Sequence, residues 1–316
     1  MKDLFDLSAR RDMSREDRRN FFRRSAGVTA GLVGGAVLSA CGGSVSEAIA
    51  QANAPSESDV LNFALNLEYL EAQFYLRAVG RDLEADLKAS GDTMGLDGVG
   101  TRGAVTGGRA VNFTSKRLRE YAQEIAEDEF NHVRFLRKAL GAAAVSQPAI
   151  DLQNSFNAAA KAAGVGDSFD PYADETSFMI GAFVFEDVGV TAYKGAAGFL
   201  AKNAAVLDAA AGIMAVEAYH AGLVRGFLVN QADGVIDAAN KISAIRGAVS
   251  SDAIAAGMSN GADQGITVAG VANVVPTDAN GIAYSRTPND VLRIVYLNAD
   301  KTAGGFFPAG VNGAVA

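Results

Sequence analysis

Cysteine and histidine are scarce in this chain of 316 residues, which contains one cysteine and two histidines. A single cysteine excludes an internal disulfide, a cysteine-based zinc site and a cysteine-ligated iron–sulfur cluster. The two histidines, His132 and His220, exclude any chemistry that needs three imidazoles from one chain. Hydrophobic residues make up 49% of the sequence, which is enough for a packed core and too much for a disordered chain.

Basic residues are also scarce once the N-terminus is set aside. Residues 1–24 hold eight of the 28 Lys and Arg residues against five acids, which leaves 20 basic and 31 acidic residues, a net −11, in residues 25–316. Nucleic-acid binding needs a basic surface that neutralises phosphates. We therefore expect no nucleic-acid partner.

The basic N-terminus is followed by a long uncharged stretch. Residues 18–24 read Arg-Arg-Asn-Phe-Phe-Arg-Arg, and residues 25–46 carry no charge and are rich in Ala, Gly and Val. This order resembles a bacterial twin-arginine export signal. A transmembrane helix is the alternative, but the many glycines make the stretch weakly apolar. We predict export by the twin-arginine route to the periplasm or cell envelope.

The one cysteine lies within that stretch, in the sequence Leu-Ser-Ala-Cys-Gly at residues 38–42. This sequence resembles a lipobox, in which cleavage precedes the cysteine and its sulfur is acylated. The alternative is ordinary signal-peptidase cleavage at a small-residue site such as residues 48–50, which would discard Cys41. We predict a signal peptide over residues 1–40, a membrane anchor on Cys41 and a tether over residues 41–55.

Four long helices are predicted in the rest of the chain. The capping residues and apolar spacing place them at residues 56–80, at 114 or 115 to 140, from Asp170-Pro171 to about 200, and at about 203–231. Helices of about 25 residues span about 38 Å each. This length suits an all-α four-helix bundle with a crossover connection over residues 56–231.

Long connections and a C-terminal extension surround these helices. Residues 90–113 are glycine-rich and predict a loop, and residues 142–171 form a second connection with a short helix near 152–163. A fifth helix is expected near residues 236–258. No periodicity follows Gly261, so residues 232–316 are predicted to form an extension of low regularity.

Both histidines occur in the same short pattern in the middle of a predicted helix. Glu129-x-x-His132 lies on the second helix, and Glu217-x-x-His220 lies on the fourth. Residues three apart share one face of a helix, so both side chains of each pair can reach one metal ion. The pattern indicates a metal site inside the bundle.

The other two helices each supply an inward glutamate. Glu186 lies in an otherwise apolar stretch of the third helix, whereas Glu68 and Glu71 compete on the first. An internal repeat favours Glu68, because Tyr75 follows it by seven residues, as Tyr193 follows Glu186. We therefore predict Glu68 as a ligand and Glu71 as a neighbour that either contacts the ligands or is solvated.

Charge counting supports a metal centre with two ions. The predicted ligands are Glu68, Glu129, His132, Glu186, Glu217 and His220. Four carboxylates and two neutral imidazoles carry four negative charges, and burying them unpaired costs several kcal/mol each. Two divalent cations neutralise the set. Oxygen and nitrogen ligands without a thiolate suit iron first and manganese next, while zinc stays open.

With these motifs the sequence resembles the ferritin-like di-iron carboxylate superfamily over residues 56–231. It also resembles, more narrowly, bacterial ferritin-like proteins related to plant desiccation-related proteins, through residues 61–72, 286–296 and 304–308. The resemblance to the Asp-Glu-x-x-His motif of di-iron oxygenases implies that Asp128 orients His220. Tyr75 and Tyr193 either donate hydrogen bonds to ligand carboxylates, carry an electron, or pack as core tyrosines.

Two functions remain open at this level. A di-iron centre could react with oxygen or peroxide, and manganese in similar ligands would suit peroxide disproportionation. Alternatively, the metals stabilise a protective or structural protein of the cell envelope. A homo-oligomer is compatible with both functions, but the long inserts and a tail of about 80 residues fit a ferritin cage poorly.

Overall fold

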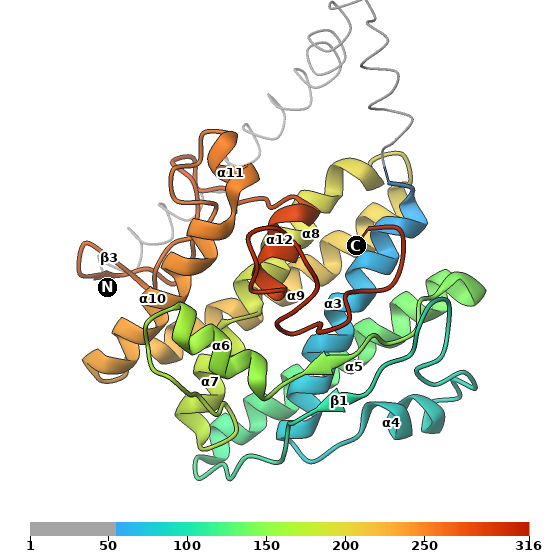
Figure 1. The fold of residues 1–316 in the computed structure, drawn as a ribbon, viewed down its shortest axis with the longest axis horizontal. Helices are drawn as coiled ribbons and strands as arrows, with labels where there is room; N and C mark the ends of the chain where they lie inside the picture. The colour runs from blue at the N-terminus through green and yellow to red at the C-terminus, as the bar shows by residue number, and fades with distance from the viewer. Residues whose placement is uncertain (1–54, 316) are drawn as a thin grey trace, which may run out of the picture. The chain divides into compact units, whose positions relative to one another are not determined.

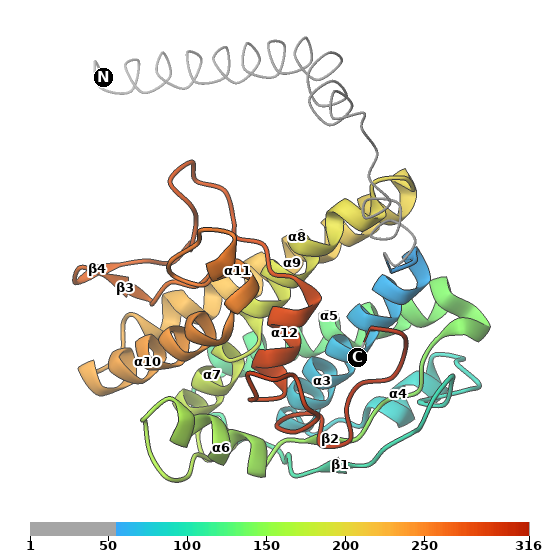
Figure 2. The same cartoon turned by 45° about the horizontal axis from the view of Figure 1, so that its top comes forward.

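The structure is a computed structural model that describes residues 55–315. The predicted signal peptide, the lipidation site at Cys41 and the tether up to residue 54 lie outside the described residues. Among residues 55–315, no helix is both long enough and apolar enough to cross a membrane. Figures 1 and 2 show long helices enclosed by extended connections and a C-terminal extension.

Four long helices form the predicted all-α bundle. They are α3 (Glu57–Ala78), α5 (Lys116–Leu140), α8 (Glu186–Leu200) and α9 (Ala204–Leu228). The helices α3 and α5 pack along each other, as do α8 and α9, and the pairs meet through α3 with α8 and α5 with α9. At the start of α3, Ser56 and Asp59 cap each other's backbone N–H groups, as the sequence suggests.

The third helical segment begins later than predicted. Its first part, α7 (Glu175–Phe183), starts after the N-cap Asp174 and not at Asp170-Pro171. The Asp170 carboxylate instead forms an ion pair with Arg109 at 2.6 Å and accepts a backbone hydrogen bond two residues further on. The helix begins after this turn, where the Asp174 side chain accepts a hydrogen bond from the backbone N–H of Ser177.

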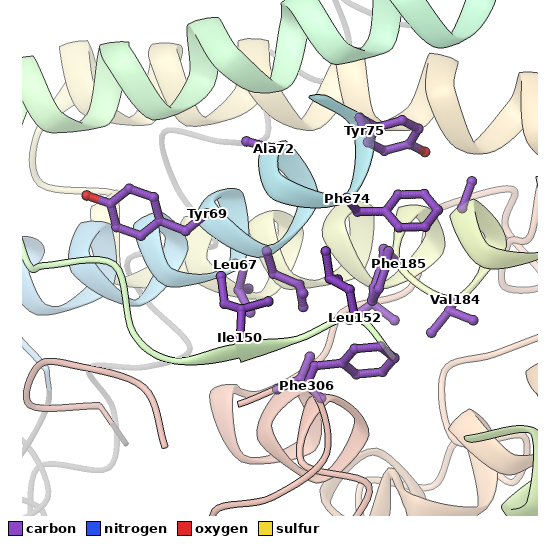
Figure 3. Packing of buried hydrophobic residues seen from close by; sticks show 14 of the residues in the cluster. Leu67, Tyr69, Ala72, Phe74, Tyr75, Ile150, Leu152, Val184, Phe185 and Phe306 are labelled. Carbon is purple, nitrogen blue, oxygen red and sulfur yellow. The ribbon is translucent and has the colours of Figure 1, made fainter. Parts of the chain in front are cut away.

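The third segment is also broken, a feature that the apolar spacing of the sequence does not indicate. The helix α7 ends at Phe183 and α8 begins at Glu186. The backbone N–H groups of Val184 and Phe185 bond to carbonyls three residues back instead of four. The Phe185 ring packs edge-on against the ring of Phe306 and points into the core (Figure 3). The break therefore places Glu186 in the first turn of a new helix.

The two long connections wrap around α3 and contain short elements of their own. These are α4 (Leu83–Ala89), β1 (Val105–Thr106), η1 (Gly141–Ala143), β2 (Ile150–Asp151) and α6 (Asn154–Ala162). The strands β1 and β2 pair in parallel. A Cβ on Gly103 would lie 2.1 Å from the Ala149 nitrogen, so the glycine permits their close approach. The short helix predicted near residues 152–163 is α6, whereas α4 was not predicted.

The C-terminal extension is mostly irregular, with three helices. Its elements are α10 (Asp233–Val249), α11 (Ser251–Ala255), β3 (Thr267–Val268), β4 (Val271–Ala272) and α12 (Pro288–Val295). The single fifth helix predicted near residues 236–258 is divided at Ser250. The low regularity expected for the extension holds, although α12, which is capped by Thr287 and begins with proline, was not predicted.

The extension shares one hydrophobic core with the bundle. Leu292, Ile294 and Phe306 from the extension belong to the same buried cluster as Phe74 of α3. Figure 3 shows Phe306 below α3, next to Phe185 and Leu152. The extension therefore covers the bundle beside the junction of α7 and α8, close to the start of α8.

Candidate metal centre

The bundle buries together the six residues that the sequence predicts as ligands, and none is more than 8% exposed. They are Glu68 of α3, Glu129 and His132 of α5, Glu186 of α8, and Glu217 and His220 of α9. Each helix turns its members inward because residues three apart share one face. Their assignment as ligands remains a prediction, but the structure brings all six to one place.

One group of four side chains converges around His132. One ligand atom from each of Glu68, Glu129, His132 and Glu217 lies within 4.8 Å of all the others. The Nδ1 atom of His132 is 3.2 Å from Glu68 Oε2, 3.6 Å from Glu129 Oε2 and 3.7 Å from Glu217 Oε1. We refer to this group as the first position.

A second group converges around His220 and shares Glu129 with the first. Ligand atoms of Glu129, Glu186 and His220 lie within 4.8 Å of one another. The Nδ1 atom of His220 is 3.2 Å from Glu129 Oε1 and 3.5 Å from Glu186 Oε2. We refer to this group as the second position. Because Glu129 contributes to both, its two oxygens can bridge two ions.

Many oxygen and nitrogen atoms of this cluster that could bind a metal have no hydrogen-bond partner among the described residues. These atoms are both carboxylate oxygens of Glu129 and Glu217, Glu186 Oε2, Glu71 Oε1 and His220 Nδ1. Although His220 Nδ1 lies near Glu129, the two do not form a hydrogen bond. Buried polar atoms are nearly always paired in proteins, so the cluster fits bound cations. Its oxygen and nitrogen donors suit iron or manganese.

Asp128 contacts the outer nitrogen of His220. Asp128 Oδ2 lies 3.1 Å from His220 Nε2, on the side opposite to the Nδ1 atom that faces the carboxylates. The contact joins α5 to α9, as the resemblance to di-iron oxygenases implies. A carboxylate in this place orients the ring and favours a proton on Nε2, which leaves Nδ1 free to bind a metal.

The two repeated tyrosines hydrogen-bond to the carboxylates of the opposite helix pair. Tyr75 of α3 donates to Glu186 of α8, and Tyr193 of α8 donates to Glu68 of α3. Both tyrosines are buried, and burial raises the pKa of each hydroxyl well above its usual value. They therefore act as neutral donors that orient two of the predicted ligands, the first of the roles proposed for them.

The sequence offers two alternatives for Glu71, a neighbour of the ligands or a solvated residue, and the structure excludes the second. Glu71 is only 4% exposed. One of its carboxylate oxygens lies within 4.8 Å of ligand atoms of both Glu186 and Glu217. Its spacing of three residues from Glu68 is the signal that could have placed it on the same helix face.

Without metal, the two histidines hold protons among the carboxylates. Burial opposes charge on His132, but the negative charges of Glu68 and Glu129 outweigh it and raise its pKa to about 12. Burial also opposes charge on His220, yet its pKa is raised, chiefly by Glu186. Burial raises the pKa of Glu68 to about 7, and His132 partly offsets this. Metal binding must therefore displace protons from the cluster.

The carboxylates are not equivalent in the metal-free state. Burial raises the pKa of Glu71 and of Glu217 well above the usual range, and neighbouring carboxylates raise them further. Burial opposes ionisation of Glu129 too, but the charges of His132 and His220 hold its pKa well below the usual range. Glu129 is therefore ionised before metal arrives.

A glycine on α8 makes room for Glu217. A Cβ added to Gly189 would lie 2.2 Å from Glu217 Oε2 and 3.0 Å from its carboxyl carbon. Because Glu217 is fully buried, its side chain has little space in which to move away. The absence of a side chain at residue 189 thus allows the Glu217 carboxylate to enter the cluster.

Gly189→Ala is expected to weaken metal binding by about tenfold or more, the size of effect seen when groups around metal ligands are changed. The added methyl group displaces Glu217, which faces the first position. Gly198→Ala is the matched control on the same helix, because a Cβ there meets no atom within 4 Å. Equilibrium dialysis with Mn²⁺ compares the two variants, and equal affinities would contradict the packing argument.

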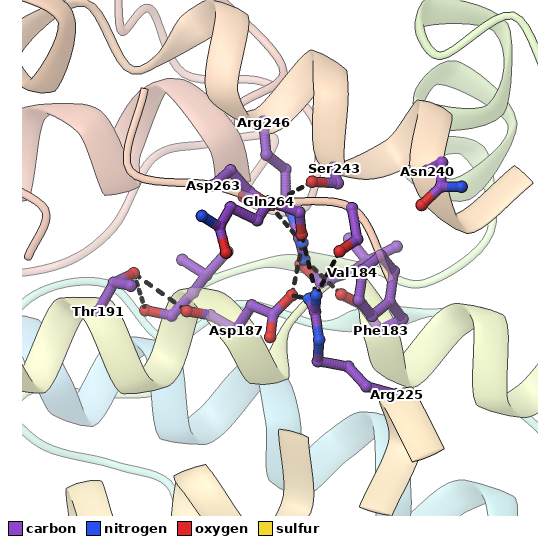
Figure 4. A network of polar contacts seen from close by, with 12 residues as sticks. Phe183, Val184, Asp187, Thr191, Arg225, Asn240, Ser243, Arg246, Asp263 and Gln264 are labelled. Atoms are coloured by element: carbon purple, nitrogen blue, oxygen red, sulfur yellow. Dashed lines mark hydrogen bonds and ion pairs between the residues drawn. The ribbon is translucent and has the colours of Figure 1, made fainter. Parts of the chain in front are cut away.

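A buried ion-pair network anchors the start of α8. Asp187 accepts hydrogen bonds from Arg225 at 2.8 Å and from Arg246 at 2.7 Å, and Arg246 also reaches Asp263 (Figure 4). Arg286 donates to the same Asp263 at 2.6 Å. The network ties α8 to α9, α10 and the C-terminal extension. It therefore positions the turn that carries the ligand immediately before Asp187.

Two apolar cavities lie beside the cluster. A cavity of about 260 Å³ lies between α6, α7, α10 and α12. Val184 and Ile294 line it and also line a smaller cavity of about 20 Å³ that reaches Glu71. The smaller cavity has room for about one water-sized molecule. The two cavities share lining residues beside the junction of α7 and α8, and only the smaller one touches a residue of the cluster.

The sequence comparison decides the family. A ferritin-like domain matches residues 56–230, more than half of the chain. This chain belongs to the ferritin-like family. The matched range covers all four helices that supply the cluster, so the family assignment and the site geometry concern the same part of the chain. The predicted superfamily is confirmed.

Two relatives resemble this ferritin-like chain over most of its length. The ferritin-like catalase Nec2 of Nesocodon mauritianus is 27% identical over 287 residues, which cover 83% of this chain and 85% of that protein. The desiccation-related protein PCC13-62 of Craterostigma plantagineum is 28% identical over 254 residues, 75% of this chain and 76% of that protein. No solved structure matches the chain. The predicted relation to desiccation-related proteins is confirmed.

Proposed function

We propose that this protein is an exported ferritin-like metalloprotein whose two metal ions, iron first and manganese next, react with peroxide or oxygen. The observation that carries the proposal is the set of buried, unpaired carboxylate and imidazole donors in two overlapping groups. Glu68 and His132 would hold one ion, and Glu186 and His220 the other. Glu129 and Glu217 would lie between them.

Two redox-active ions in these ligands would supply or accept the electrons that oxygen and peroxide chemistry needs. The chain's own residues prepare the site for that chemistry. Tyr75 holds the carboxylate of Glu186, and Tyr193 holds that of Glu68. Asp128 orients His220. The buried surroundings exclude bulk water from the cluster, because none of the six predicted ligands is more than 8% exposed.

Peroxide disproportionation is the reaction that the relatives favour most, because one of them is named a ferritin-like catalase. In that reaction two molecules of hydrogen peroxide yield one of oxygen and two of water, so no further electron donor is required. The name of the desiccation-related relative supports a place in stress protection. That same name favours the second candidate, a protective envelope protein in which metal only stabilises the fold.

The test combines metal analysis with kinetics. Protein recovered from the exported fraction is assayed for iron, manganese and zinc, and its reduced form is then mixed with oxygen and with peroxide in a stopped-flow instrument. We expect two redox-active ions per chain and rapid consumption of peroxide. Glu129→Gln should abolish both, because it removes the bridging carboxylate. Zinc in the native protein, or no reaction with either oxidant, would favour the protective role.

Export and anchoring have their own test. We expect a mature protein that begins at a lipidated Cys41 and is held in a membrane leaflet, because dual acylation gives stable anchoring. Mass spectrometry of the mature N-terminus reads this directly. An unmodified start at Gln51 would exclude the lipoprotein while leaving export intact. Retention of residues 1–40 would exclude both.

The proposed partners are oxygen or peroxide and a membrane. Oxygen or peroxide would reach the centre, and the membrane would hold the anchor, while the acidic chain gives no basis for binding nucleic acid. A homo-oligomer is compatible with the fold. We do not propose a ferritin cage, because the connections and the C-terminal extension enlarge the outside of the bundle.

A further inference from the structure

Glu71 is a buried carboxyl group that the six-residue centre does not use. It lies on α3, one turn after Glu68, and is 4% exposed. Its Oε1 atom forms no hydrogen bond with any residue of the described part of the chain. A buried carboxyl oxygen without a partner is unfavourable by about 1–3 kcal/mol or more. The Glu71 Oε1 atom is therefore a buried oxygen that is available to bind a cation.

The surroundings of Glu71 offer further ligands for a cation on one side only. Towards the cluster, one of its oxygens lies within 4.8 Å of ligand atoms of Glu186 and Glu217. Away from it, Glu71 faces the cavity of about 20 Å³, where every other lining side chain is apolar and Gly189 contributes none. No side-chain hydrogen-bond donor lies in that lining. Among the side chains of the described residues, those that could share a bound cation with Glu71 therefore lie on the side of Glu186 and Glu217.

Glu186 links Glu71 to the second position. Glu186 belongs both to the group with Glu129 and His220 and to the group with Glu71 and Glu217. An ion bound to the shared Glu186 carboxylate would therefore have up to five side chains within reach, whereas an ion at the first position would have four. Since more anionic ligands bind a cation more tightly, the two positions should differ in affinity.

We propose that Glu71 is an additional ligand of the metal ion at the second position. The proposal rests on the two-metal centre of the proposed function. The second position is then the tighter one and is filled first. The first position has fewer protein ligands, so the ion there would keep an open coordination position for peroxide or oxygen. The two ions have different tasks, one held firmly and one reactive.

A metal titration tests this without measuring activity. The metal-free full chain is titrated with Mn²⁺, and the free ion is followed by its electron paramagnetic resonance signal. Wild type should bind two ions in two resolved steps. Glu71→Gln should weaken the tighter step by about tenfold or more and leave the weaker step nearly unchanged. Glu68→Gln should instead weaken the looser binding step, which belongs to the first position around His132.

Two controls keep the result interpretable. Glu124→Gln makes the same charge change on an exposed face of α5 and should alter neither step. Circular dichroism verifies that each metal-free variant is folded. If Glu71→Gln fails to fold, a crystal structure of the Mn²⁺-loaded wild type decides, because the Glu71 carboxylate must then lie in bonding distance of the ion near His220.

The outcomes separate this inference from the proposed function. An unchanged titration of Glu71→Gln, or equal weakening of both steps, would overturn the role of Glu71 while leaving peroxide turnover untouched. The expected loss of the tighter step in a protein that reacts with neither oxidant would support the role of Glu71 and refute the redox function. Absence of tight Mn²⁺ binding to wild type would overturn the role of Glu71, while the redox function would still be decided by the metal analysis and the stopped-flow kinetics.

Discussion

Removing the bound metal is expected to lower the melting temperature of the protein strongly at pH 8 and only slightly at pH 5. Metal binds the folded cluster and not the unfolded chain, so each site adds about 3–4 kcal/mol when free metal is 100 to 1,000 times its dissociation constant. In the metal-free protein, the buried carboxylates repel one another instead. The difference between the two forms is therefore the largest effect that we expect at the centre.

The pH dependence follows from the pKa values of the metal-free fold. The pKa of Glu68 rises from 4.5 to about 7 on folding, so its burial is harmless below pH 4.5 and destabilises the fold as pH rises through 7, by on the order of 3 kcal/mol. The pKa of His132 rises to about 12, so its stabilising contribution is complete below pH 6.5 and declines above it. Both groups therefore make the metal-free fold less stable at pH 8 than at pH 5, and at pH 8 metal also competes with fewer protons.

Calorimetry of metal-free and metal-loaded protein at both pH values measures this effect, with metal content verified in each sample. Glu129→Gln serves as the control, because added metal should no longer raise its melting temperature. Identical melting temperatures for verified metal-free and metal-loaded wild type at pH 8 would mean that the cluster is not a shared metal site.

Asp187→Asn is expected to destabilise the protein by about 3–5 kcal/mol, because it removes one partner of a buried ion-pair network. Arg225 and Arg246 would keep their charges in the interior with Asp263 as the remaining carboxylate near Arg246. The variant should also bind less metal, since Asp187 positions the turn that carries Glu186. Urea unfolding and metal analysis measure the two effects.

The matched control is Asp237→Asn on α10. Asp237 forms an ion pair with Lys241 at 2.8 Å, but both side chains are well exposed to solvent. An exposed pair contributes about 0–1 kcal/mol, so this variant should unfold close to wild type. A loss of stability for Asp187→Asn no greater than that of the control would contradict the anchoring role of the network.

The sequence by itself determined which helix faces carry the six predicted ligands. A spacing of three residues places a glutamate and a histidine on one helix face wherever the helix packs, so the pairs of α5 and α9 could be read directly. The repeat of glutamate and tyrosine placed Glu68 and Glu186 in equivalent registers. The helix faces could be predicted because helix geometry is local and regular.

Only the tertiary structure decided the details that depend on distant partners. The ion pair of Asp170 with Arg109 and the core contacts of Phe185 join segments far apart in the chain, so the start and the break of the third segment were missed. The tyrosines face the opposite helix pair for the same reason.

Glu71 shows most clearly what local sequence spacing determines and what tertiary packing determines. Its place on the helix face of Glu68 is a local property that the sequence contains. Its burial against Glu186 and Glu217, and the apolar wall behind it, depend on how α3 packs against α8, α9 and the extension. Secondary structure sets the direction of a side chain, but the partner that it meets is set by packing between helices, which the local spacing of residues does not encode.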